Sequence, residues 1–173
     1  MLLSLLPLAA FALNVTDKVS EVELTLREPK AGENVNLELS SVEVKHHMTY
    51  KVVGLRWYKL GDDRPMGLNN GSDTYFIGGN SYTVEIDLQV KEGNGGWNVE
   101  YEALETDYSG IHATVNGKTA TVKYPPMNSD QHKTITVEYS FGYIDDGMIN
   151  YPSVFIPSPI AGDYPPKKED LKV

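Results

Sequence analysis

Apolar side chains recur at every second position along several segments of this 173-residue chain. The longest alternation begins at Tyr82 and ends at Val90, with polar or charged residues between the apolar ones. Because successive side chains on a β-strand point to opposite faces, this pattern predicts strands with one buried and one solvated face. The predicted inward-facing sets are Val22, Leu24 and Leu26; Val35, Leu37 and Leu39; Val53, Leu55 and Trp57; Tyr82, Val84, Ile86, Leu88 and Val90; and Ile135, Val137, Tyr139 and Phe141.

Residues with turn chemistry separate these segments. Asn116-Gly117 supplies two residues that tolerate positive φ between β-prone arms, which predicts a tight hairpin over residues 113–122. Pro29 cannot donate to a sheet ladder, so the first strand is expected to end just before it. No segment has a convincing helical period. Seven or eight short strands punctuated by turns predict an all-β protein, folded as an antiparallel β-sandwich.

One phrase of the sequence occurs twice. Residues 26–35 read LREPKAGENV and residues 156–165 read IPSPIAGDYP, each after an alternating apolar stretch. Both copies contain Pro-x-Ala-Gly followed by an acidic residue, which is an uncommon match for a chain of this length. The repetition favours a tandem array of similar units.

The array interpretation divides the chain into four parts. Residues 18–143 form one complete sandwich, and residues 144–150 form a short polar linker. Residues 151–173 are then the first strand of a truncated second copy. The alternative is that residues 151–173 are only an extended tail.

The fourth part is the N-terminal segment, residues 1–17. It holds an uninterrupted run of apolar or small residues from Leu2 to Ala12, too short to span a bilayer as a helix. The run is typical of the apolar region of a secretory signal, and Ala10 and Ala12 supply the small residues that a signal peptidase reads. A basic stretch before it is missing, and a short buried strand or helix is the alternative. We expect a secreted or cell-surface protein.

Composition excludes several classes of function. The formal net charge is −9, whereas binding to nucleic acid or to anionic lipid requires clustered Lys and Arg. The chain has no cysteine, so disulfides, thiolate zinc sites and cysteine nucleophiles are excluded. A hydrophobic fraction of 40% is sufficient for a packed core. The mature domain is expected to have no membrane span.

The aromatic residues offer one candidate binding surface. Trp57 has the inward parity of its strand and is expected to pack between the sheets. Trp97 follows a Gly-rich turn, and if exposed beside Tyr101 or Tyr108 it provides a platform that stacks on a sugar ring. Packing of these residues inside the protein or at its end is the alternative, and the one favoured here.

The remaining chemistry is sparse, and no catalytic residue, cofactor or metal site is predicted. His46 and His47 are adjacent, so on a strand they point to opposite faces and cannot share a metal. No nucleophile-elbow motif is present. Asp62-Asp63 and Asp145-Asp146 lie in predicted loops, where they are solvated or help to hold calcium between successive domains. We expect that the chain is not an enzyme.

The order of several phrases resembles a known family. EPKAGENV, LRWYKL, FIGGNSYTVEIDLQV, ATVNGKTATV and ITVEYSF are similar to immunoglobulin-like modules of large exported proteins of Gram-positive bacteria. The resemblance covers most of residues 20–142 and consists of structural residues, so it implies a fold and a setting and transfers no catalytic residue. The unit is longer than those modules, with the excess near residues 43–52 and 98–112.

The resemblance implies an immunoglobulin-like sandwich that serves as a non-catalytic spacer or adhesive module of an exported bacterial surface protein. Its expected partners are neighbouring repeats of the same chain, and a cell-wall or host glycan or protein. The alternative is an accessory carbohydrate-binding module of a secreted glycoside hydrolase, with Trp97 and the nearby tyrosines as its platform.

Overall fold

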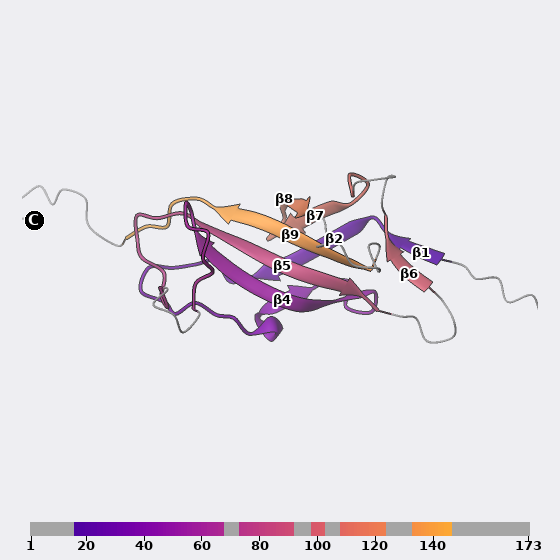
Figure 1. The fold of residues 1–173 in the computed structure, drawn as a ribbon, viewed down its shortest axis with the longest axis horizontal. Coiled ribbons are helices and arrows are strands. Elements are labelled where there is room, and N and C mark those ends of the chain that lie inside the picture. Colours follow the sequence, from indigo (N-terminus) through magenta and orange to yellow (C-terminus); the bar gives the residue numbers. More distant parts are fainter. Residues whose placement is uncertain (1–15, 68–72, 92–97, 103–107, 124–132, 147–173) are drawn as a thin grey trace, which may run out of the picture.

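The computed structural model describes residues 16–67, 73–91, 98–102, 108–123 and 133–146, and these residues form nine strands and one 3-10 turn (Figure 1). Their bounds are β1 Thr16–Val19, β2 Glu21–Leu26, η1 Leu39–Ser41, β3 Val42–Val44, β4 Tyr50–Lys59, β5 Tyr82–Val90, β6 Asn98–Tyr101, β7 His112–Val115, β8 Lys118–Lys123 and β9 Thr134–Phe141. The predicted all-β, sandwich-like fold is confirmed. No helix in this part of the chain is long and apolar enough to cross a membrane.

Seven strands form one sheet in the order β3-β2-β7-β8-β9-β5-β4. The sheet folds over at β8, because residues 118–120 pair with β7 whereas residues 121–123 pair with β9. No ladder joins β3 to β4 among the described residues, so the structure is a barrel open along one seam. The two halves of the sheet enclose a single apolar core.

Alternation along the strands builds that core. The inward residues of β2 and β5 are buried as predicted, as are Ile135, Val137 and Phe141 of β9. Trp57 is 3% exposed and lies between Phe76 and Phe141, with ring centroids 5.0 and 5.5 Å away. The aromatic cluster therefore fills one end of the sandwich, where the β4–β5 connection lies.

The predicted hairpin is also confirmed. Asn116 and Gly117 have φ of 52° and 74° between β7 and β8. The Asn116 side chain additionally bonds to the backbone of Leu26, accepting from its N–H at 3.0 Å and donating to its carbonyl at 2.9 Å. The hairpin turn thereby fixes the end of β2.

Two strand predictions were wrong in detail. The register of β4 against β5 shifts between Val52 and Gly54, so Val53 sits at a β-bulge and points outward, 43% exposed. A bulge adds a residue to one strand and reverses the parity on either side of it. Residues 35–39 form no strand: Val35 and Leu37 only pack beside the core, and Leu39 begins η1.

The sheet is mixed, whereas a purely antiparallel one was expected. β1 pairs in parallel with β6, and β2 pairs in parallel with β7. The two pairings are consistent with each other, because β1 and β2 follow one another through Ser20 and pair with β6 and β7 in the same order along the chain.

Candidate functional site

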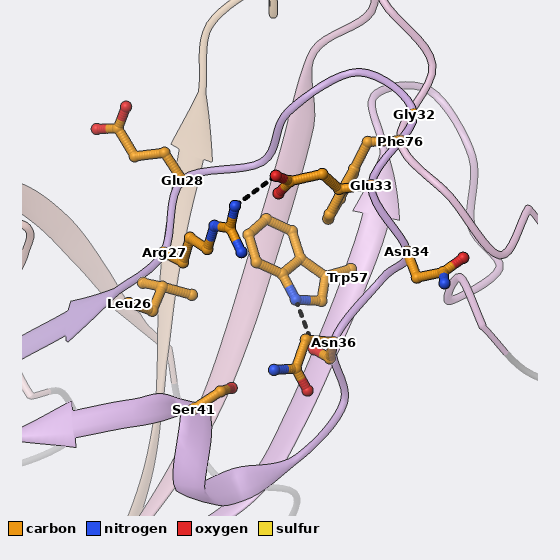
Figure 2. A pocket seen from close by; sticks show the side chains of 10 residues that line it. All are labelled: Leu26, Arg27, Glu28, Gly32, Glu33, Asn34, Asn36, Ser41, Trp57 and Phe76. Carbon is orange, nitrogen blue, oxygen red and sulfur yellow. Dashed lines mark hydrogen bonds and ion pairs between the residues drawn. The ribbon is translucent and has the colours of Figure 1, made fainter.

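A shallow pocket of about 440 Å³ opens where β2 ends and the Pro-x-Ala-Gly phrase begins (Figure 2). Arg27, Glu28 and Glu33 line its rim, and the indole of Trp57 lies beneath them. Its volume lies in the range of small-molecule pockets. It is the first place to examine for a binding function.

Backbone pairing holds the rim of this pocket. The N–H of Gly32 donates to the carbonyl of Phe76 at 2.7 Å, and the N–H of Phe76 donates to Glu33 at 2.9 Å. Gly32 has φ of 79°, a conformation that favours glycine. The indole N–H of Trp57 donates to the carbonyl of Asn36 at 3.2 Å, so the loop is tied directly to the core.

Several polar side chains of the pocket already have partners within the protein. The Arg27 guanidinium forms an ion pair with Glu33 across the opening (Figure 2). The Ser41 hydroxyl donates to the carbonyl of Glu38 at 2.6 Å, and the Asn36 side chain accepts from the N–H of Glu38 at 2.9 Å. These interactions secure the loop over Trp57, and the described lining contains no nucleophile paired with a base.

A second group of polar residues forms a ladder across the outer face of the sheet. Arg56 of β4 binds both carboxylate oxygens of Asp87 at 2.5 and 2.9 Å and also contacts Glu85 at 3.2 Å. Lys123 of β8 joins Glu85 at 3.0 Å and pairs with Glu138 of β9. The charged ladder therefore links four strands.

The charged ladder shifts the ionisation of its members. Partial burial by itself raises the pKa of Asp87, but hydrogen bonds from Arg56 and Thr136 outweigh it and hold that pKa below its ordinary value. The pKa of Glu85 is lowered in the same way, with Lys123 and Arg56 opposing the effect of burial. The Glu138 carboxylate, together with Glu85, raises the pKa of Lys123. All these groups are charged at neutral pH.

Gly54 makes room for this arrangement. A Cβ built on Gly54 would lie 2.4 Å from Oδ2 of Asp87, the oxygen that receives Nη1 of Arg56. Any side chain at position 54 would displace that carboxylate from the guanidinium. The bulge at Val53 and the glycine after it thus serve the charged ladder on the outer face.

The predicted stacking platform is not presented at the surface by the residues that the structure describes. Tyr101 has no exposed surface, and Tyr108 is 7% exposed. The Tyr101 ring lies 6.5 Å from that of Tyr50, inside the core. Trp97 lies outside the described residues. Tyr101 and Tyr108 therefore follow the packing alternative for such residues.

The histidines and acidic pairs stay apart from one another. His46 and His47 are exposed in the turn between β3 and β4, and Nε2 of His46 lies 3.6 Å from a Glu23 oxygen. Asp62-Asp63 and Asp145-Asp146 are exposed. No group of three or more His, Asp or Glu residues within the described ranges could hold a metal ion. The structure thus adds nothing to the expectation of calcium at domain junctions.

The charged ladder was not predicted as a unit. Alternation placed Arg56, Glu85, Asp87 and Glu138 on outward faces, which the structure confirms. Their mutual contact depends on the register of β4, β5 and β9, and hence on the bulge. The alternating pattern alone gives each strand a polar face without saying which residues on neighbouring strands lie opposite one another.

Comparison with known proteins identifies no relative. No protein-family model, no curated protein and no solved structure matches the chain. The function is therefore argued from the geometry described above.

Proposed function

We propose that this chain is a non-catalytic spacer module of an exported bacterial surface protein, and that it transmits tension between the segments on either side of it. The proposal keeps the immunoglobulin-like resemblance as its setting. It is supported chiefly by the direction of two strands, β2 and β9.

Strand pairing fixes the relative direction of β2 and β9. β2 is parallel to β7, β7 is antiparallel to β8, and β8 is antiparallel to β9, so β2 and β9 run the same way. The chain accordingly enters the sandwich at one end, at β1, and β9 leads toward the other (Figure 1). A module with this arrangement extends a chain and does not fold it back on itself.

The same directions determine how a pull is resisted. Tension applied beyond β1 and beyond β9 draws each strand along its own axis. The inter-strand hydrogen bonds lie across the strands, so tension loads many of them together. β2 is held by β3 and β7, and β9 by β5 and β8. Resistance to forced unfolding depends on the unfolding rate, and this geometry slows that rate.

Single-molecule stretching tests the proposal, and a cysteine-free chain allows handles at chosen sites. One variant carries Asp17→Cys with Asp145→Cys and is pulled along the strands. A second carries Leu60→Cys with Ser81→Cys, at the ends of β4 and β5, and is pulled across them. We expect a clearly higher unfolding force for the first variant at equal pulling speed. Equal forces would contradict a tension-bearing role.

A glycan array run with the unmodified chain separates the spacer from the carbohydrate-binding alternative. Binding that disappears in Trp97→Ala would replace the spacer proposal by that alternative. The expected result is no glycan binding in either protein.

A further inference from the structure

The chain leaves the sandwich through a segment that is fastened to the rest of the fold. After β9, the N–H of Ile144 donates to the carbonyl of Asn80 at 3.0 Å, and the N–H of Gly79 donates to the carbonyl of Ile144 at 2.9 Å. The Ile144 side chain also packs against the core. The predicted linker over residues 144–150 therefore begins with a residue that belongs to the domain.

A glycine permits this close attachment. A Cβ built on Gly78 would lie 2.1 Å from Cα of Asp146 and 2.9 Å from its backbone nitrogen. Backbone atoms cannot move aside as easily as the end of a flexible side chain. A residue other than glycine at position 78 would therefore push Asp146 and the chain that follows it away. We call residues 77–80 together with 142–146 the exit clamp.

The exit clamp is anchored in the core. The Tyr82 hydroxyl accepts from the N–H of Ile77 at 2.7 Å and lies 3.0 Å from the carbonyl of the same residue. Asn80 donates from its side chain to the carbonyls of Ile77 and Gly78 at 3.2 and 3.1 Å. Tyr82 is fully buried against Phe76. The direction in which the chain departs is thus fixed by the fold.

Exposed apolar side chains surround this fixed exit. Tyr143 is 82% exposed and Leu60 is 68% exposed, and Ile77 shows part of its surface. Leu60 belongs to the same end, since its N–H donates to the carbonyl of Ser81 at 2.9 Å. Tyrosine is enriched in protein interfaces, and Tyr143 is itself part of the exit clamp. This end of the molecule has the character of a docking surface.

We propose that the docking surface around the exit clamp is covered by residues 151–160 of the same chain, YPSVFIPSPI. This segment is rich in apolar residues and follows the clamp after four residues. A tether of that length spans at most about 17 Å. It holds the segment near the surface at an effective concentration in the millimolar range, so weak intrinsic affinity is sufficient.

The proposal deepens the spacer function and rests on it for its purpose. A following segment that docks on the exit clamp keeps the next part of the chain in a set direction, so the joint is stiff. A free segment would let successive parts swing. Docking is independent of the pairing of β2 and β9, which the stretching experiment measures.

Chymotrypsin cleavage of the full chain after Phe155, followed by mass spectrometry, tests the docking. The test variant is Tyr143→Ser, which removes apolar surface without touching the hydrogen bonds of the clamp. The matched control is Val53→Ser, which removes an exposed apolar side chain at the β-bulge near the opposite end of β4. We expect cleavage after Phe155 to be several-fold faster in Tyr143→Ser than in the wild type and unchanged in Val53→Ser.

Two outcomes would overturn the proposal. Equal cleavage rates in all three proteins would mean that the segment does not dock on this surface. Protection that grows with protein concentration would mean that a second copy of the chain covers it instead. In either case a high unfolding force along the strands would leave the spacer function standing, so the two proposals fail separately.

Discussion

The two ends of the sandwich each contain a fully buried tyrosine, and they use it differently. At the end where the chain leaves, the Tyr82 hydroxyl bonds to both backbone polar groups of Ile77. At the end where the chain arrives, the hydroxyl of Tyr101 in β6 has no hydrogen-bond partner among the residues that the structure describes. Burial strongly raises the pKa of Tyr101, so this hydroxyl stays neutral. One tyrosine is a polar anchor for a loop, and the other is an apolar filler with an unpaired polar atom.

The difference shows how each end is held. The departing end depends on specific hydrogen bonds that fix a turn, together with the aromatic cluster around Trp57. The arriving end depends on strand pairing, because β1 and β6 form a parallel two-stranded ribbon, and the ring of Tyr101, at the end of β6, is buried near Tyr50. The departing end should therefore be sensitive to single polar changes, whereas the arriving end should tolerate them.

The largest expected effect comes from removing the centre of the aromatic cluster. Trp57→Ala leaves a cavity between Phe76 and Phe141 and loses the bond to Asn36, so we expect a loss of about 3–5 kcal/mol in the free energy of unfolding. Urea titration followed by circular dichroism measures it. Val53→Ala, at an exposed site of the same strand, should change stability by less than about 0.5 kcal/mol. A small effect of Trp57→Ala would mean that the cluster does not support the departing end.

The second largest effect on stability is expected at Tyr82, whose hydroxyl anchors the loop. Tyr82→Phe retains the packed ring but removes the acceptor of the Ile77 N–H, which should cost about 1–2 kcal/mol, while the carbonyl of Ile77 keeps its bond from Asn80. Hydrogen exchange of the Ile77 amide should become faster as well. If that amide exchanges as before, the hydroxyl is not what holds the turn.

A third prediction concerns the charged ladder, which lies on the outer face between the two ends. Because the pKa values of Asp87 and Glu85 lie below their ordinary 3.8 and 4.5, the unfolded chain binds more protons in acid than the folded one. The charged ladder therefore contributes stability above those values, and the contribution is lost as the pH falls through the lower folded pKa values. Asp87→Asn should cost about 1 kcal/mol at pH 7 and flatten the dependence of stability on pH below 5. An unchanged slope would exclude Asp87 as its source.

The smallest effect on stability is expected at Tyr101, and it gives the most direct comparison with Tyr82. Tyr101→Phe removes a buried hydroxyl that has no partner in the described part of the chain, so stability should stay within about 0.5 kcal/mol or rise slightly. The loss of stability seen in Tyr82→Phe should therefore be absent, although the chemical change is identical. Thermal unfolding of the two variants side by side measures it. A loss as large as that in Tyr82→Phe would show that the hydroxyl of Tyr101 is bonded.

Much of the strand framework could be predicted from local sequence. Strict alternation from Tyr82 to Val90 identified β5 and its buried face, and Asn116-Gly117 identified a hairpin, because both signals depend on a few adjacent residues. The alternation at residues 35–39 was misleading, since those residues lie in a loop, next to an isolated bridge between Asn34 and Tyr75.

The remaining features depend on contacts between distant residues. The outward turn of Val53 follows from a bulge that is visible only in the register of β4 against β5. The burial of Tyr101 follows from its packing near Tyr50, and the exit clamp follows from the approach of residue 146 to Gly78. Alternation within a single strand says nothing of such partners.

The double use of Asn116 bears on the order in which the molecule assembles. The β7–β8 hairpin closes over about ten residues, so it can form within microseconds. The bonds from Asn116 to Leu26 join residues 90 positions apart, and such closure is slow. We therefore expect Asn116→Gly, which retains the turn, to accelerate unfolding while leaving the refolding rate nearly unchanged. Asn116 would then form the hairpin turn early in folding and bond to the end of β2 only late in folding.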